Sequence, residues 1–273
     1  MTPFAHPATW LAGYIPDLPT PFDENGGVDL TAFAKLCERQ IEADVSAIVV
    51  GETAGEASTL TPVEHDGIVR AAVEVARGRV RVIAGAGSNS TSQAIELTRR
   101  AEAAGADAVL SVVPYYNKPM QAGIYAHFQA TAGSTALPII LHDIPSRTIR
   151  ELSDDTLARL AESRQFIGLR DGTGDIARPM RLRSLLPSGF RLLSGDVYCQ
   201  RRGWLHIDDI ECRAGAVSGH FFELPAGTAA VRAISAKSTG AADGRAHQRE
   251  PGCAEICDVP ARLHVAKHPP ADR

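Results

Sequence analysis

Short apolar runs alternate with longer segments of helical periodicity over the first 196 residues of the chain. The short runs predict seven β-strands, because runs of this length bounded by turn residues are typical of buried strands. The predicted strands lie at 13–18, 46–50, 80–84, 108–112, 138–142, 166–169 and 190–193. Segments between them carry apolar residues at helical spacing, among them 30–41, 68–76, 94–103 and 157–161.

Two segments carry the residues typical of a helix start. Thr61 is a capping residue followed by Pro62, and Glu64 stands three positions on, the spacing of a capping box. Ser153 precedes Asp154 and an adjacent second aspartate, whose carboxylates are favourable near the positive end of a helix. Helices are therefore expected to begin at these points.

Strands that alternate with helices imply a parallel sheet, because each parallel crossover needs a covering helix. Seven such units without a Gly-x-Gly-x-x-Gly opening favour a closed TIM (β/α)8 barrel over an open nucleotide-binding sheet. The segment 85–87, Gly-Ala-Gly, lacks the third glycine and is interpreted as a tight turn. Because the pattern stops after residue 196, we divide the chain into barrel units at 1–196 and a tail at 197–273, and expect an incomplete barrel.

Composition narrows the classes of partner and compartment. The 273 residues include 28 Lys+Arg and 32 Asp+Glu, a net charge of −4 without a basic cluster, which disfavours nucleic acid and anionic membranes as partners. Apolar runs stay short of the roughly 20 residues of a spanning helix, and residues 1–10 lack the pattern of a secretory signal. Five scattered cysteines predict a cytoplasmic protein without a disulfide framework.

In a barrel of this kind, chemistry is carried by the loops that follow the strands. The loop 51–56, Gly-Glu-Thr-Ala-Gly-Glu, offers the Thr53 hydroxyl to a substrate or a proton relay; the alternative is a loop in which Thr53 bonds its own backbone. The loop 114–119 holds Tyr115 and Tyr116, of which at least one is expected to pack or to act, and Lys118, which is expected to be solvated.

Two further loops carry arginines. In the loop 142–148, Arg147 is suited to bind a carboxylate with its planar fork, or alternatively forms an ion pair with Glu151. His142 ends the preceding strand. In the loop 168–175, Arg170 is expected to point into the barrel, where its charge needs a partner, and Asp171 and Asp175 are the nearby acids.

Together these segments resemble the dihydrodipicolinate synthase and N-acetylneuraminate lyase family, most closely its synthase branch. The similar strings occur in the family's order over about seven-tenths of the chain: SAIVVGETAGEASTLT (46–61), VIAGAGSNST (82–91), PYYNKP (114–119), LPIILHDIPSRT (137–148), GLRDGTGD (168–175) and LLSGD (192–196). The resemblance implies a lyase of the class I aldolase type that binds pyruvate as an imine (Schiff base) on a lysine, without cofactor or metal. It also implies condensation with aspartate semialdehyde in lysine biosynthesis, and a homo-oligomer, a tetramer in the family.

The resemblance also implies roles for particular residues. Thr53 matches the threonine of the family's hydroxyl relay, and Tyr116 matches the tyrosine that a neighbouring subunit donates. Arg147 matches the arginine that receives the second substrate's carboxylate. Ala54 replaces a hydroxyl residue that the family uses near the pyruvate carboxylate.

The sequence departs from the family at two further positions, one in the proton relay and one at the imine-forming lysine. His142 stands where the family has a relay tyrosine, and an imidazole can still move protons near neutral pH. Arg170 stands where the family has the imine-forming lysine. A guanidinium stays protonated and offers no free amine to a carbonyl. We therefore predict that Arg170 prevents imine catalysis, although it still offers a charge that can hold an α-keto acid; Lys118 is the only nearby substitute amine.

The tail at 197–273 does not continue the resemblance. Back-translation of 203–222 and 250–273 with suitable synonymous codons, read one nucleotide later, gives strings similar to the family's seventh-strand region and carboxyl-terminal helices. This pattern suggests the hypothesis of a frameshift product that replaces the last barrel units and leaves two strand edges exposed. The alternative, a metal site of His247, Cys253, Cys257 and His264, matches no common zinc spacing.

The sequence thus predicts a dihydrodipicolinate synthase-like lyase whose turnover Arg170 and the tail impair. Two alternatives remain open. One is a non-catalytic protein that binds an α-keto acid such as pyruvate, and the other is a lyase for a different keto-acid adduct.

Overall fold

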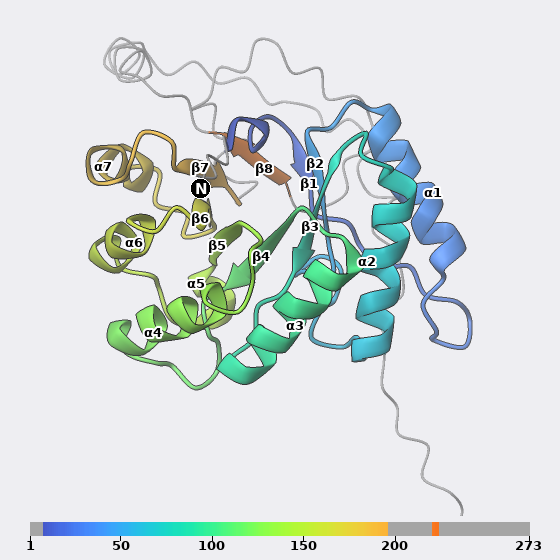
Figure 1. Cartoon of the computed structure of the whole chain (residues 1–273), viewed down its shortest axis with the longest axis horizontal. Helices are drawn as coiled ribbons and strands as arrows, with labels where there is room; N and C mark the ends of the chain where they lie inside the picture. The colour runs from blue at the N-terminus through green and yellow to red at the C-terminus, as the bar shows by residue number, and fades with distance from the viewer. Residues whose placement is uncertain (1–7, 196–219, 224–273) are drawn as a thin grey trace, which may run out of the picture.

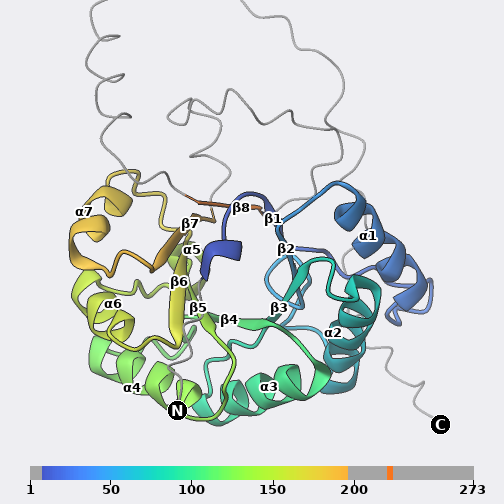
Figure 2. The same cartoon turned by 45° about the horizontal axis from the view of Figure 1, so that its top comes forward.

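The computed structural model describes residues 8–195 and the strand β8 (His220–Glu223). The remainder of the tail lies outside the described residues, and with it the frameshift hypothesis and the Cys/His set. In the described part, parallel strands curl into a ring with helices around its outside (Figures 1 and 2). The TIM-barrel class is therefore confirmed, with an irregular eighth position.

The strands follow the predicted runs to within two residues at each end. They are β1 (Ile15–Pro16), β2 (Ala47–Val50), β3 (Arg81–Gly85), β4 (Ala108–Val112), β5 (Ile139–Asp143), β6 (Phe166–Asp171) and β7 (Arg191–Ser194). From β2 to β7, each strand pairs in parallel with the next one along the chain. This is the order that successive right-handed crossovers produce.

The ring closes in two ways. Beside β2, Asp17 forms a parallel bridge with Val49, and the Leu18 N–H donates to the Val49 carbonyl at 2.9 Å. On the other side, β8 lies between β1 and β7 and is antiparallel to both (Figure 2). The expectation of two open strand edges is therefore wrong for the backbone of β1 and β7. A short antiparallel strand nevertheless replaces the parallel strand-helix unit expected at this position.

Several of the helices begin where the sequence supplies a capping side chain. The helices are η1 (Ala8–Trp10), α1 (Leu30–Glu42), α2 (Pro62–Ala76), α3 (Thr91–Ala104), α4 (Gln121–Ala132), α5 (Pro145–Thr148), α6 (Asp154–Ala161) and α7 (Arg178–Leu185). Thr61 and Glu64 form the predicted capping box of α2, and Ser153 caps α6 by accepting from the Thr156 N–H. The predicted helix starts are thus confirmed.

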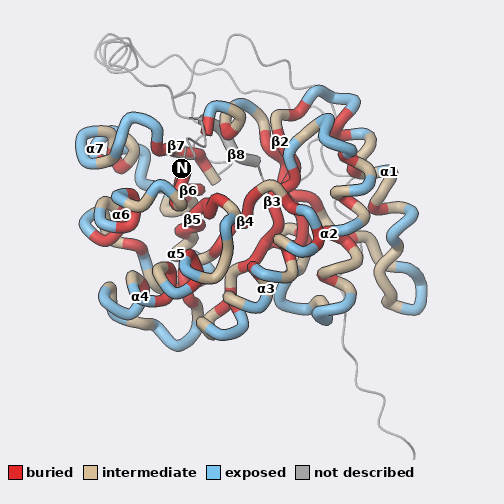
Figure 3. The backbone as a smooth tube through the Cα atoms, in the orientation of Figure 1, coloured by how far each residue is buried: buried red, intermediate tan, exposed pale blue. Residues whose placement is uncertain are grey.

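Two apolar cores share the strands. Side chains on one face of each strand pack against the helices, while those on the other face fill the interior of the ring. Buried residues follow the strands around the ring (Figure 3). The interior core includes Ile15, Val49, Ile83, Leu110, Ile140 and Leu193, and Ala8 and Leu11 of the η1 region pack against it. Because side chains alternate along a strand, this interior set identifies which residues point toward the barrel axis.

Candidate active site

His142 and Arg170 lie side by side at the carboxyl ends of two neighbouring strands. They are register partners in β5 and β6, and their side chains are 0% and 4% exposed. His142 stands two residues after Ile140 of the interior core, so it points to the same side of β5. Gly195 leaves room for Arg170, because a Cβ on it would lie 3.0 Å from the Arg170 Cγ. Arg170 thus lies at the mouth of the barrel, beside His142, as predicted.

Two buried carboxylates hold the Arg170 guanidinium. Its Nη1 lies 2.9 Å from Oδ2 of Asp17, which follows β1, and 3.3 Å from Oε2 of Glu52, which follows β2. The other Glu52 oxygen, Oε1, lies 2.9 Å from Nδ1 of His142. The Thr53 N–H also donates to Oε2 of Glu52. These contacts make one polar cluster of Asp17, Glu52, His142 and Arg170, which we call the mouth cluster.

Burial shapes the titration of the mouth cluster. It raises the pKa of Asp17 to about 7, against the opposing charge of Arg170. Burial also opposes ionisation of Glu52, but His142 and Arg170 outweigh it and hold the pKa of that carboxyl well below its usual range. For His142, burial lowers the pKa and Glu52 only partly compensates. Near neutral pH, the Glu52 carboxylate therefore balances the Arg170 guanidinium.

The other predicted site residues lie nearer the solvent. Thr53 is half-buried and adjacent in sequence to Glu52, and Ala54 follows it. Arg147 is exposed on α5, and its charge contributes to lowering the pKa of His142. Within residues 8–195 it forms no ion pair, so the predicted alternative of a pair with Glu151 is wrong in this structure.

The loop after β4 turns its side chains outward. Tyr116 is 85% exposed and has a φ of 69°, in the left-handed region that non-glycine residues rarely adopt. Tyr115 is half-buried, and Lys118 is exposed. The structure thus brings His142 and Arg170 together and places Thr53 beside their shared carboxylate. No hydrogen bond within the described residues links Tyr116 to this cluster.

The predicted partners of Arg170 were wrong. Asp171 lies next to it along β6 and therefore faces the opposite side of the strand. Its Oδ1 lies 3.5 Å from Nη1 of Arg178, while Asp175 pairs with Arg181 at 2.8 Å. Sequence reasoning missed the actual partners, Asp17 and Glu52. Asp17 lies inside the first predicted strand, at 13–18, and a charged residue within a buried strand is the signal that could have identified it.

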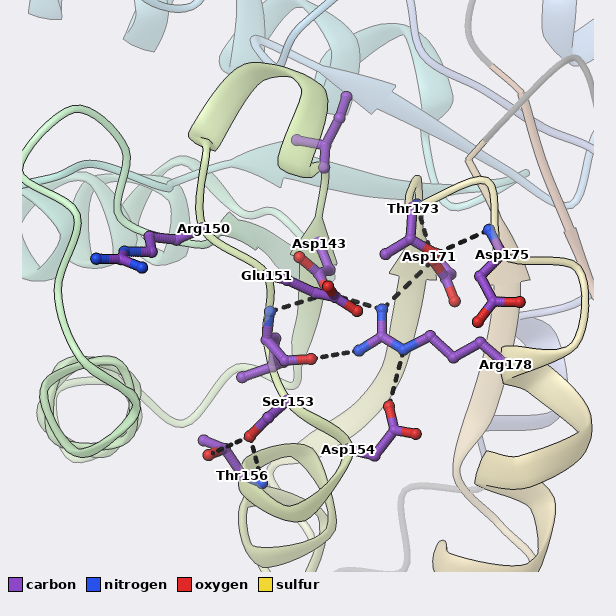
Figure 4. Close-up of polar contacts among 12 residues, drawn as sticks. Asp143, Arg150, Glu151, Ser153, Asp154, Thr156, Asp171, Thr173, Asp175 and Arg178 are labelled. Atoms are coloured by element: carbon purple, nitrogen blue, oxygen red, sulfur yellow. Dashed lines mark hydrogen bonds and ion pairs between the residues drawn. The ribbon is translucent and has the colours of Figure 1, made fainter.

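Arg178 is the centre of a second buried cluster (Figure 4). This cluster lies at the ends of β5 and β6, on the face opposite His142 and Arg170. The Nη1 of Arg178 lies 2.7 Å from Oδ2 of Asp143 and its Nε 2.9 Å from Oδ1 of Asp154. Its Nη2 donates to the Leu152 carbonyl. Burial raises the pKa of Asp143 to about 7, against the charge of Arg178. This cluster joins α7 to the ends of β5, β6 and α6, and we assign it a structural role.

Within the described residues, no helix is long and apolar enough to cross a membrane. Nor does that part of the chain gather three or more His, Cys, Asp or Glu side chains in a way that could hold a metal ion.

A ring of parallel strands with ionisable groups gathered at its carboxyl ends defines the class of (β/α)8-barrel proteins, in which this end carries the chemistry. Comparison with known proteins makes the assignment specific. The model of the Dihydrodipicolinate synthetase family matches residues 10–205, and the chain belongs to this family.

Curated relatives carry the name 4-hydroxy-tetrahydrodipicolinate synthase. The protein of Hyphomonas neptunium (strain ATCC 15444) is 52% identical over 186 residues, which are 67% of this chain and 63% of the relative. The protein of Gluconobacter oxydans (strain 621H) is 48% identical over 184 residues, 67% of this chain and 62% of the relative. The matched region thus spans slightly less than two thirds of these relatives.

Solved structures agree with this assignment. The dihydrodipicolinate synthase of Acinetobacter baumannii, solved as a complex with pyruvate, is 45% identical with a TM-score of 0.66, covering 68% of this chain and 64% of that chain. The synthase of Aquifex aeolicus is 43% identical with a TM-score of 0.66, covering 68% and 63%. The resemblance stated from the sequence motifs is therefore confirmed.

Proposed function

We propose that the chain is a dihydrodipicolinate synthase-type lyase by descent whose imine step is blocked at Arg170. The observation that carries this proposal is the guanidinium of Arg170, buried at the end of β6 where the family's sequence pattern has a lysine. An imine forms when a neutral amine nitrogen attacks the carbonyl carbon and the carbonyl oxygen leaves as water. A delocalised, permanently charged guanidinium has no nitrogen lone pair free for this attack.

The ion pairs of Arg170 also limit its use as a clamp for a keto acid. Its charge is balanced by buried carboxylates at 2.9 and 3.3 Å, so a substrate carboxylate would have to displace one of them. Displacement is costly, because it leaves a buried carboxylate without its partner. The paired Arg170 is therefore a weaker binding group for the pyruvate carboxylate than an unpaired arginine would be.

The test treats the full chain with pyruvate and sodium cyanoborohydride near neutral pH and then measures its intact mass. Cyanoborohydride would deliver hydride to the carbon of an imine and fix it as a secondary amine. The expected result is an unchanged mass for this chain. A family synthase with the lysine, treated in parallel, must gain the pyruvyl adduct. A pyruvyl adduct on this chain would overturn the proposal, and peptide mapping would show whether Lys118 carries it.

Turnover is measured separately, in an assay that supplies pyruvate and aspartate semialdehyde. Under the proposal, product formation stays at the level of a protein-free control. Turnover without a trapped adduct would show that the condensation runs by a route other than the imine, and would also contradict the proposed block.

Arg147 favours a second candidate function, non-catalytic binding of an α-keto acid. It is exposed on α5 near His142 and forms no ion pair among the described residues, so its planar fork is free to bind a carboxylate. Calorimetric titration with pyruvate should then show saturable binding that Arg147→Met abolishes and the exposed control Arg99→Met preserves. Equal binding by both variants would exclude this role.

The exposed position of Tyr116 supports the proposal that copies of the chain assemble and that this side chain serves a neighbouring subunit. A tyrosine that is 85% exposed with a strained φ is better explained by a contact with another chain than by packing within its own. Light scattering after gel filtration measures the assembly state, and a strictly monomeric protein would contradict the proposal.

A further inference from the structure

We infer that Asp17 and Glu52 are a second determinant that excludes imine chemistry from this barrel, because they would keep an amine placed at position 170 protonated. The inference rests on the proposed function, since it concerns the same site. It predicts that the exchange of Arg170 for lysine does not by itself restore the nucleophile. In this barrel mouth, three charged positions, Asp17, Glu52 and Arg170, would then exclude the imine together.

The geometry of the two carboxylates supports this inference. Asp17 and Glu52 approach Nη1 of Arg170 from different strand ends, after β1 and after β2. Both are almost fully buried, with side chains 0% and 7% exposed. A lysine side chain at position 170 is shorter than arginine but would end in the same space, between the two carboxylates. An ammonium group there would face two acidic partners and little water.

The Glu52 carboxylate and the backbone of Asp17 are held in place by contacts that do not involve Arg170. The backbone beside Asp17 is fixed by its parallel bridge to Val49. Glu52 accepts from the Thr53 N–H through Oε2 and contacts Nδ1 of His142 through Oε1. Exchange of the arginine therefore leaves Glu52 in position and the backbone that carries Asp17 fixed.

Nearby negative charge opposes the step that an imine needs. Opposite charges within about 4 to 6 Å favour the charged form of a group, and their effect grows as water is excluded. An ordinary lysine, with a pKa of about 10.4, is already neutral in only a small fraction at pH 7.5. Each further unit of pKa reduces the neutral amine about tenfold. Imine-forming lysines need the opposite environment, apolar or beside another cation.

The test compares three full-length variants by the rate at which pyruvate and sodium cyanoborohydride add mass to the residue at position 170. The first carries Arg170→Lys alone. The second adds Asp17→Asn and Glu52→Gln, which remove both charges and keep the side-chain shapes. The third, a matched control, instead adds Glu24→Gln and Glu42→Gln, which change the net charge equally at exposed positions.

At pH 7.5, the variant without the two buried acids should form the adduct at least about 10-fold faster than Arg170→Lys alone, one pKa unit being a factor of ten in neutral amine. The exposed-site control should match Arg170→Lys. Equal rates for all three variants would overturn the inference. The inference would also be overturned if the acid-free variant, with Asp17→Asn and Glu52→Gln, formed no adduct although circular dichroism showed it to be folded.

A second measurement needs only Arg170→Lys. Its trapping rate, measured from pH 7 to 11, should rise with a midpoint above about 10.4, the pKa of an unperturbed lysine. A midpoint near 7 to 8 would overturn the inference even if the acid-free variant did not fold. Failure of the proposed function is recognised differently, because it would appear as an adduct on the unmodified chain.

Discussion

Removal of the Arg178 guanidinium is expected to destabilise the barrel strongly. Arg178 is 0% exposed, and the exchange Arg178→Met keeps an apolar stem of similar length while removing every polar contact of the head group. Two buried carboxylates, those of Asp143 and Asp171, would lose their cationic partner. Asp154 is 26% exposed and remains partly hydrated, so the loss of its ion pair with Arg178 costs less stability.

The expected magnitude follows from this burial. Breaking a buried ion pair by removing one partner costs about 3 to 5 kcal/mol, against a total domain stability of about 5 to 15 kcal/mol. The matched control is Arg181→Met, because Arg181 is 52% exposed and pairs with Asp154 and Asp175. A pair of this exposure contributes about 0 to 1 kcal/mol. The two variants therefore separate burial from charge.

The stability lost in Arg178→Met should also depend on pH, because burial raises the pKa of Asp143 to about 7. Below that value the folded protein holds Asp143 as a neutral acid, which needs the arginine less. Urea unfolding followed by circular dichroism should thus show a larger loss for Arg178→Met at pH 8 than at pH 5, with part of the loss recovered in Arg178→Met/Asp143→Asn. Losses that are equal for the buried and the exposed arginine, or independent of pH, would refute this reasoning.

Three further predictions concern other parts of the barrel. A Cβ at Gly85 would lie 2.1 Å from the Gly51 carbonyl oxygen. Gly85→Ala should therefore lower the free energy of unfolding, measured by urea titration, by about 1 to 3 kcal/mol, as overpacking does. The control Gly189→Ala should be nearly neutral in the same titration, because a Cβ there meets nothing within 4 Å. Burial raises the pKa of Asp17 to about 7 in the folded state, so its contribution to stability is present in acid and is lost as the pH rises through about 7. Asp17→Asn should flatten the fall in unfolding free energy between pH 5 and 8, and an unchanged slope would contradict the assignment. Thr61→Ala, which removes the cap of α2, should cost about 1 kcal/mol in thermal or urea unfolding, and no measurable loss would show that the capping box does not contribute.

The order of elements in the barrel could be read from the sequence. Apolar runs place the strands, and local capping chemistry at Thr61 and Ser153 places two helix starts, because both signals depend on neighbours along the chain. Helix α7 gives a weak signal of this kind. Its buried side chains are Arg178 and Leu182, so its main anchor is an ion cluster and not an apolar stripe.

Only part of the arrangement at the barrel mouth could be predicted from the sequence. Alternation along β5 and β6 is a local property, and together with the family motif it is enough to place His142 and Arg170 beside each other at the strand ends. The identity of the acids that hold Arg170 is not a local property. Asp171 is its neighbour in sequence but lies on the other face of β6, while Asp17 is separated from it by 153 positions.

The strand-helix repeat and the family could therefore be read from the sequence, since both depend on patterns and identities along the chain. The same motifs carry the prediction that Arg170 stands in place of an imine-forming lysine. Tertiary structure alone decided the electrostatic surroundings of Arg170, because closure of the ring brings the ends of β1 and β2 against the end of β6. It also decided the closure itself, in which β8 pairs with β1 and β7 in the antiparallel direction. Ion pairs and strand direction depend on which distant segments meet in space.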